Sequence, residues 1–266
     1  MRKLLGLIGL VVLVVLAGCG SEAGALSEDE VTVGVTAGPH EQILEKVKEL
    51  AADEGLTVNI EVFTEYVIPN TALDEGELDL NSYQHQPFLD NAKSDRGYEI
   101  EAVATTVNFP MGIYSTGISD VSELEEGDSV ALPNDPTNGA RALMLFEDAG
   151  LITLKEGVGA EAMVIDIEEN PLNLEFIELE ASQIPRQLEE VDAAAINTNF
   201  AIEHGFVPTE DSIYIEPSDS PWVNLIVARE ENVDAPVVEK FINIYQSDEI
   251  KQFIEDTFEG SVVASW

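Results

Sequence analysis

Apolar residues recur along the chain at spacings that alternate between those of strands and those of helices. Residues 31–38 form a short β-rich run that ends in glycine, and residues 40–55 then place apolar side chains at helical spacing. The alternation continues toward the C-terminal end, which predicts a parallel α/β architecture. We expect further strands at 57–63, 78–83, 98–107, 129–133, 174–180, 192–197 and 222–230, and helices at 68–78, 86–97, 137–150, 184–191 and 236–258, the last as one helix or two.

The N-terminal segment follows a different pattern. Two basic residues precede an apolar run from Leu4 to Ala17, which is shorter than the about 20 residues that a membrane-spanning helix needs. We therefore interpret residues 1–18 as an export signal. Residues 16–19 read Leu-Ala-Gly-Cys and resemble the bacterial lipobox, in which the cysteine is lipidated and becomes the first residue of the mature protein.

The cysteine content supports this interpretation. Cys19 is the only cysteine of the 266 residues, so no intramolecular disulfide can form. We expect a lipid on Cys19 that anchors the protein to the extracytoplasmic face of the cell membrane, with residues 19–30 as a flexible tether. The alternative is an ordinary secretory signal with an incidental cysteine.

The balance of charge is strongly acidic. The chain has 12 basic and 52 acidic residues, a formal charge of −40. Such a surface excludes nucleic-acid binding through phosphates and adsorption to anionic lipids through a basic patch. Removal of the export signal takes away two basic residues and leaves −42, which suggests a saline habitat where salt screens self-repulsion. The alternative is an acidic protein from an ordinary organism.

Polar residues stand at or just after the ends of several predicted strands. Each of them could be a helix cap or a turn residue. Together they would place amides and hydroxyls around one crevice, because ligands of such folds bind at the carboxyl ends of the strands. These residues are Thr36, Asn81, Asn134 and Asn197.

Arg141 stands near the start of a predicted helix that begins at Asp135 or Pro136. A cation at this position opposes the helix dipole, and arginine is scarce in this chain. An anion held jointly by the guanidinium and the first-turn N–H groups would explain it. A salt bridge to one of the many acidic residues is the alternative.

The stretch NSYQHQPFLD, residues 81–90, holds one of three histidines between two aromatic residues. His40, His85 and His204 show no spacing typical of a zinc site, and we expect neither a metal nor a cofactor. The sequence also lacks a GxSxG motif, a P-loop and a GxGxxG motif, so no catalytic partner for His85 is indicated. The stretch is either the wall of a ligand pocket or an aromatic cluster packed against a loop.

Several long stretches resemble the NlpA/MetQ lipoproteins, the substrate-binding proteins of methionine ABC importers. They are EYVIPNTALDEGELDLNSYQHQPFLD, PNDPTNGARALMLFEDAGLI, ENPLNLEFIELEASQIPRQLEEVDAAAINTNFA and PWVNLIVARE, in this order. The resemblance covers nearly all of the mature chain. It implies a two-lobed type II periplasmic-binding-protein fold with the ligand in the interlobe cleft, one lobe comprising 31–112 with 224–266 and the other 113–223.

The resemblance also implies roles by position. Arg141, helped by Asn138, would pair with the carboxylate of the ligand, and Asn197 and Asn224 would accept from its ammonium group. An aromatic wall would surround the thioether of the ligand. At two positions this wall differs from that of many family members, which carry Phe at position 83 and Tyr at 88. The wall residues are Tyr66, Tyr83, His85 and Phe88.

The function implied is that of a non-enzymatic, lipid-anchored protein that captures L-methionine and passes it to an ABC permease with its ATPase. The same scaffold could bind D-methionine, a methionine dipeptide or another apolar amino acid. An exported metal-dependent hydrolase and an adhesive surface lipoprotein are further alternatives, and the sequence leaves them open.

Overall fold

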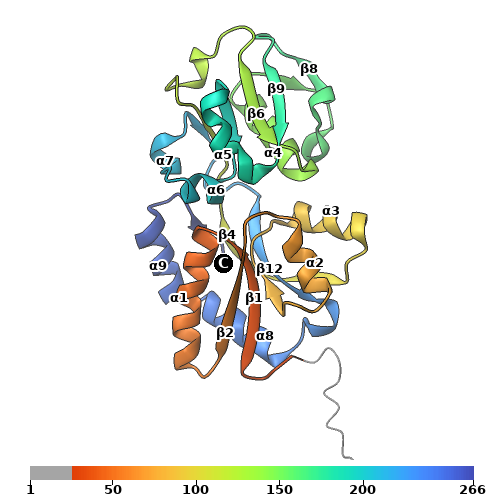
Figure 1. Cartoon of the computed structure of the whole chain (residues 1–266), viewed down its shortest axis with the longest axis vertical. Coiled ribbons are helices and arrows are strands. Elements are labelled where there is room, and N and C mark those ends of the chain that lie inside the picture. Colours follow the sequence, from red (N-terminus) through yellow and green to blue (C-terminus); the bar gives the residue numbers. More distant parts are fainter. Residues whose placement is uncertain (1–25) are drawn as a thin grey trace, which may run out of the picture.

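The computed structural model describes residues 26–266, which fold into two α/β lobes (Figure 1). The export signal and Cys19 lie outside the described residues. Each lobe is built on its own sheet, so the expectation of a two-lobed α/β fold is confirmed. Within residues 26–266, no helix has the length and the apolar content needed to cross a membrane.

The first lobe contains a six-stranded sheet with the order β13-β4-β12-β3-β1-β2. Its strands β1, β2 and β3 run parallel, whereas β12 is antiparallel to both β3 and β4. The parallel arrangement expected from the sequence holds for β1, β2 and β3, and β12 departs from it. The strands are β1 (Glu30–Thr36), β2 (Thr57–Phe63), β3 (Leu80–Asn81), β4 (Ile100–Asn108), β12 (Val223–Arg229) and β13 (Val263–Ala264).

The antiparallel pair has a simple cause in the path of the chain. Strand β4 leads the chain out of the first lobe, and β12 brings it back, so the two must run in opposite directions. The two connecting segments, 109–111 and 216–222, lie where the lobes meet. The side chain of Asn108 joins them, because its Nδ2 donates to the backbone oxygen of Ser220 at 2.8 Å.

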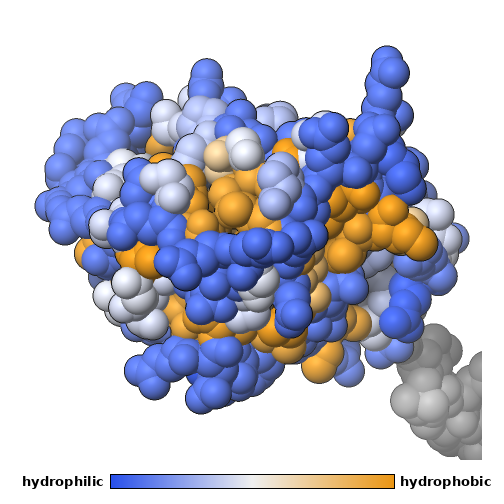
Figure 2. Space-filling view, turned by 90° about the horizontal axis from the view of Figure 1, so that it is seen from above, coloured by the Kyte–Doolittle hydropathy of each residue, from blue (hydrophilic) through white to orange (hydrophobic). Residues whose placement is uncertain are grey.

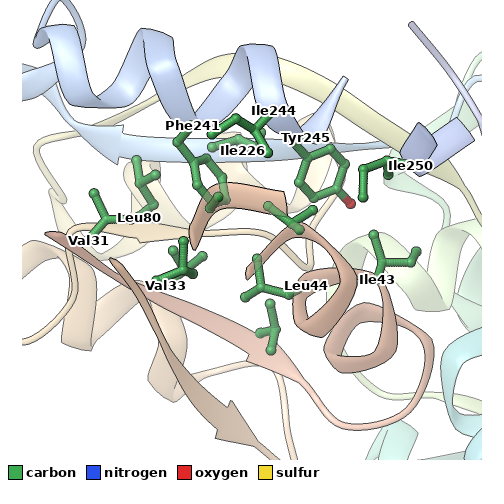
Figure 3. Close-up of a cluster of buried hydrophobic side chains, with 14 of the residues drawn as sticks. Val31, Val33, Ile43, Leu44, Leu80, Ile226, Phe241, Ile244, Tyr245 and Ile250 are labelled. Carbon is green, nitrogen blue, oxygen red and sulfur yellow. The ribbon is translucent and has the colours of Figure 1, made fainter. Parts of the chain in front are cut away.

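Apolar side chains of α1, α8 and α9 cover one face of the six-stranded sheet. Figure 3 shows Ile43 and Leu44 of α1 facing Phe241 and Tyr245 of α8 over this core. The apolar residues that recur at helical spacing in the sequence lie on one side of α1, and this side is buried. The helices of this lobe are α1 (Pro39–Asp53), α2 (Ile68–Asp74), α3 (Gln86–Arg96), α8 (Pro236–Tyr245) and α9 (Asp248–Phe258). A 3-10 turn, Glu230–Asn232, lies between β12 and α8.

The second lobe contains a five-stranded sheet with the order β11-β5-β10-β6-β9. Its strands β6, β9 and β10 are parallel, and β5 and β11 are antiparallel to their neighbours. Its core gathers residues such as Ile113, Leu132 and Phe146. The strands are β5 (Gly112–Tyr114), β6 (Ser129–Pro133), β9 (Glu175–Leu179), β10 (Ala193–Ile196) and β11 (Tyr214–Ile215), with a small separate pair β7 (Thr153–Leu154) and β8 (Ile167–Glu169).

Helix α4 is the longest described helix of the second lobe and begins where the sequence predicts. Asp135 is its N-cap and accepts a hydrogen bond from the backbone N–H of Asn138, while Pro136 occupies the first turn. The helices are α4 (Pro136–Asp148), α5 (Ile184–Gln187), α6 (Thr198–Glu203) and α7 (Pro208–Asp211), with 3-10 turns at Val121–Glu123, Gly159–Glu161, Val164–Asp166, Ala181–Gln183 and Leu188–Glu190. We keep the lobe limits 31–112 with 224–266 and 113–223 as a proposal.

The acidic surface leads to a prediction about salt. Hydrophilic side chains cover much of the face in Figure 2, and the chain has more than four acidic residues for each basic one. Mutual repulsion opposes the compact state, and at 1 M salt it is screened over about 3 Å. We expect the melting temperature to rise by at least about 5 °C from low salt to molar sodium chloride, roughly 2 kcal/mol for a chain of this size.

A thermal melt followed by circular dichroism measures this shift. An uncharged osmolyte at matched osmolality is the control, since it reports stabilisation that does not come from screening. A melting temperature indifferent to sodium chloride, or an equal rise in the osmolyte, would remove the case for a saline habitat.

Candidate functional site

A pocket lies where the two lobes meet, with about 350 Å³ of empty space when the part open to solvent is included. All eight ligand-binding residues expected from the sequence line it, together with four that were not expected. The lining residues are Tyr66, Tyr83, His85, Phe88, Asn138, Arg141, Asn197 and Asn224, and in addition Gln84, Phe109, Thr198 and Asn199.

Aromatic rings from the first lobe form one wall of the pocket. The ring of Phe88 meets those of Tyr66 and Tyr83 edge-on, with centroids 5.9 and 6.0 Å away. The Tyr83 hydroxyl donates to the backbone oxygen of Tyr66 at 2.9 Å, so the wall itself uses this polar group. Tyr83 therefore adds no unpaired hydroxyl to the wall.

A buried amide network holds the segment that carries this wall. Strand β3 ends at Asn81, and α3 begins only five residues later, so residues 82–85 form a short connection. The side chains of Asn70 and Gln84 exchange two hydrogen bonds, of 2.8 and 2.6 Å, and Asn81 donates to Asn70 at 2.9 Å. Because each of these buried amides has partners, the network fixes the connection in one conformation.

His85 closes the connection as the N-cap of α3. Its Nδ1 accepts from the backbone N–H of Phe88 at 3.2 Å, which leaves the proton on Nε2. Nε2 lies 3.3 Å from Oδ1 of Asn138 in the other lobe and donates to it. Burial lowers the pKa of His85 to about 3, and the nearby charge of Arg141 acts in the same direction, so the ring is neutral at neutral pH.

Arg141 is buried at the pocket and is held by the second lobe. Its Nε and Nη2 donate to the two carboxylate oxygens of Glu216, at 2.9 and 2.5 Å, and Nη2 also donates to the backbone oxygen of Phe109. The salt bridge left open by the sequence is therefore present. This salt bridge leaves part of the guanidinium unpaired, because among residues 26–266 no acceptor takes the two hydrogens on Nη1.

Asn138 occupies the first turn of α4, beside Arg141 and the N-cap. Its Nδ2 donates to both carboxylate oxygens of Asp135 at 3.1 Å, and burial raises the pKa of that carboxyl group. Its Oδ1 accepts from Nδ2 of Asn197 at 2.8 Å. Both ends of the Asn138 amide are thus engaged within the protein, since its oxygen accepts from Asn197 and from His85.

The segment after β10 supplies polar atoms that were only partly expected from the sequence. Thr198 donates to the backbone oxygen of Pro110 and ties this segment to the crossing at 109–111. The oxygen Oδ1 of Asn197 and the nitrogen Nδ2 of Asn199 are buried with no hydrogen-bond partner among the described residues. The signal for Thr198 and Asn199 was the polar run Asn-Thr-Asn directly after a buried strand.

The other polar residues at strand ends have different positions. Asn197 lines the pocket, whereas Thr36 and Asn81 are buried behind it and Asn134 is exposed. The expectation that all four surround one crevice is therefore wrong. Asn134 lies in the exposed turn between β6 and α4. The residues of this region that reach the pocket, Asn138 and Arg141, belong to α4.

Two contacts across the lobes enclose the pocket. The hydroxyl of Tyr66 donates to Oδ1 of Asn199 at 2.6 Å, and its ring lies 4.9 Å from that of Phe200. His85 and Asn138 form the second contact. Among residues 26–266, no group of three or more His, Cys, Asp or Glu side chains is arranged to hold a metal ion.

Comparison with known proteins places this geometry in a family. The model of the NlpA lipoprotein family matches residues 31–266. The D-methionine-binding lipoprotein MetQ of Escherichia coli K12 is 44% identical over 254 residues, which cover 94% of this chain and 93% of that protein.

Solved structures agree in both fold and sequence. A nutrient-binding protein from Burkholderia cenocepacia bound to methionine has a TM-score of 0.87 and 45% identity, over 89% of this chain and 100% of that one. A periplasmic substrate-binding protein of an ABC transporter from Coxiella burnetii has a TM-score of 0.86 and 38% identity, over 88% and 100%. By sequence and by structure, this chain belongs to the NlpA lipoprotein family.

Proposed function

We propose that this chain is a lipid-anchored substrate-binding protein that captures methionine and delivers it to an ABC importer. The pocket carries the proposal, because it joins a guanidinium and unpaired amide atoms to a wall of aromatic rings. Such a pocket suits a small zwitterion with an apolar side chain.

The polar end would hold the backbone groups of the amino acid. The Nη1 hydrogens of Arg141 are available to a carboxylate, and Glu216 keeps the guanidinium in place. The oxygens of Asn197 and Asn224 accept no hydrogen bond from residues 26–266, so they are available to an ammonium group. A ligand with one charge of each sign satisfies both ends and adds no net charge to the cleft.

The aromatic wall would hold the side chain of the ligand. A thioether sulfur gains about 0.3–1.5 kcal/mol for each favourable contact with an aromatic ring. Rings of Tyr66, Tyr83 and Phe88 meet at the pocket in tilted and edge-on arrangements. The neutral ring of His85 adds a polarizable surface without a charge that the ligand would have to neutralise.

Whether the ligand is the L- or the D-form, and a single amino acid or a dipeptide, needs a direct test. D-methionine is a second candidate, because the relatives of this chain from Escherichia coli and Yersinia pestis are named D-methionine-binding lipoproteins. Calorimetric titration with the amino acids, their D-forms and methionine dipeptides would rank them. The protein must first be unfolded and refolded, since purification can retain bound ligand. Methionine in one or both forms should bind most tightly, and a different amino acid at the top of the ranking would overturn the choice of ligand.

Delivery to a permease and the absence of catalysis belong to the same proposal. Membership of a lipoprotein family and likeness to a substrate-binding protein of an ABC transporter support a carrier role. We infer that the ligand leaves unchanged. Incubation with methionine or a methionine dipeptide, followed by mass spectrometry, should return the same compound, and turnover would contradict this part.

The lipid anchor gives a further prediction. Cys19 is the sole cysteine and stands at the end of the lipobox-like tetrapeptide. Cys19→Ser should release the protein from the membrane fraction almost completely, because the thiol that carries the lipid is lost. Fractionation and mass spectrometry of the mature N-terminus check this, and wild-type protein without lipid, together with unchanged retention of the variant, would refute the anchor.

A further inference from the structure

We propose that His40, which does not line the pocket, fixes the amide of Asn224 so that its oxygen faces the ammonium group of the ligand. His40 would thereby act as a positioning residue that selects amino acids over compounds in which another group replaces the amine. This inference rests on the proposed function and adds a residue that the pocket does not reveal.

His40 is buried in the first turn of α1, with 3% of its surface exposed. Its ring packs at a tilt against the ring of Phe109, a pocket residue, with centroids 4.5 Å apart. The ring therefore lies directly behind the pocket, between strand β1 and the lining residues. Burial lowers the pKa of His40 to about 3, so the imidazole is neutral at the pH of most natural waters.

A chain of hydrogen bonds determines which ring nitrogen carries the proton. The amide nitrogen Nδ2 of Asn224 lies 2.9 Å from Nε2 of His40 and can only donate, so Nε2 is the acceptor. In the neutral ring the proton is then on Nδ1, which donates to Oγ1 of Thr36 at 2.9 Å. The backbone oxygen of Tyr83, which can only accept, places Nδ2 of Asn224 on this side, and the tautomer of His40 with its proton on Nδ1 is the one that matches this orientation.

The orientation of Asn224 decides what the pocket presents. Its two Nδ2 hydrogens go to His40 and to the backbone oxygen of Tyr83, at 2.9 and 3.2 Å. A flipped amide would set its oxygen against the backbone oxygen of Tyr83 and, in this tautomer of His40, against a second acceptor, which is unfavourable. The oxygen of Asn224 is consequently left for the ligand, and it can accept from an ammonium group but cannot donate.

The test compares methionine with its α-hydroxy analogue, which keeps the carboxylate and the thioether. An ammonium group only donates, whereas a hydroxyl both donates and accepts, so the hydroxy acid tolerates either orientation of Asn224. A charged hydrogen bond lost through misorientation corresponds to roughly a 10- to 100-fold loss in affinity for methionine. The ratio of the two affinities therefore reports orientation, whereas a general disturbance of the pocket weakens both ligands together.

Three variants separate positioning from packing. His40→Leu removes the acceptor and should lower the ratio of methionine to hydroxy-acid affinity about 10- to 100-fold. His40→Gln keeps an acceptor on the side chain and should retain more of the ratio. Thr36→Val is nearly isosteric and removes the acceptor of the Nδ1 proton, which disfavours the tautomer that accepts from Asn224, so it should lower the ratio even if His40→Leu fails to fold.

Calorimetric titration of refolded wild type and variants, with thermal melts to establish folding, provides the ratios. The inference would be overturned if the ratio of methionine to hydroxy-acid affinity were unchanged in the folded variants among His40→Leu and Thr36→Val. An equal loss of affinity for both ligands is such a result. Wild-type protein that does not bind methionine would instead refute the proposed function, so the two failures are distinguishable.

Discussion

Arg141→Ala is expected to weaken methionine binding by about 30-fold to several-thousand-fold. Removal of one partner from a buried, charged hydrogen bond costs about 2–5 kcal/mol, which gives this range of affinities. Arg141 is 3% exposed and lines the pocket, and its Nη1 hydrogens have no acceptor among residues 26–266. Titration calorimetry on refolded protein would measure the loss.

The control for this variant follows from Glu216. In Arg141→Ala the carboxylate of Glu216 would remain buried without its partner, and such a change destabilises a fold by about 3–5 kcal/mol. The double variant Arg141→Ala with Glu216→Gln removes that charge, so it should recover stability without recovering binding. If either variant is folded and binds methionine within a few-fold of wild type, the carboxylate role of Arg141 is wrong.

His85→Gln is expected to change how stability depends on pH. The pKa of His85 is lowered from 6.5 to about 3 in the folded protein by burial, so between these values only the unfolded chain carries the proton. Stability is then lost as pH falls from about 6.5 toward 3, by about 1.4 kcal/mol for each pH unit. Above about pH 6.5, His85 does not make the free energy of unfolding depend on pH.

The measurement is the difference in free energy of unfolding between wild type and His85→Gln, from denaturant titrations at constant high salt. Relative to the variant, wild type should lose roughly 2–3 kcal/mol between pH 6 and pH 4. The many carboxylates and His40 titrate in both proteins, so their contributions largely cancel. A difference independent of pH would mean that His85 is hydrated or protonated in the folded state.

Periodicity predicted those parts of the fold whose side chains face a single core. The apolar positions of α1 and α4 point to one side of each helix, and both helices lie within two residues of their predicted limits. The direction of β12 could not be predicted in this way. A strand has the same pattern whichever way it runs, and only the return of the chain from the second lobe makes β12 antiparallel.

Individual site residues were predictable where their chemistry was unusual for their place. Arg141 stood out because a cation at the start of a helix needs a reason. Glu216 did not, since the chain contains 52 acidic residues and nothing local marks the one that pairs with Arg141. His40 and Phe109 were missed because their contacts depend on how β1, α1 and the crossing segment meet in three dimensions.

The most direct test of this account is a calorimetric titration of the refolded wild-type protein with L- and D-methionine at molar sodium chloride. We expect saturable binding of one methionine per chain, with a negative heat-capacity change from burial of the side chain against the aromatic wall. The absence of saturable binding of either form at millimolar concentrations, in refolded protein that shows a cooperative melt, would contradict the proposed function.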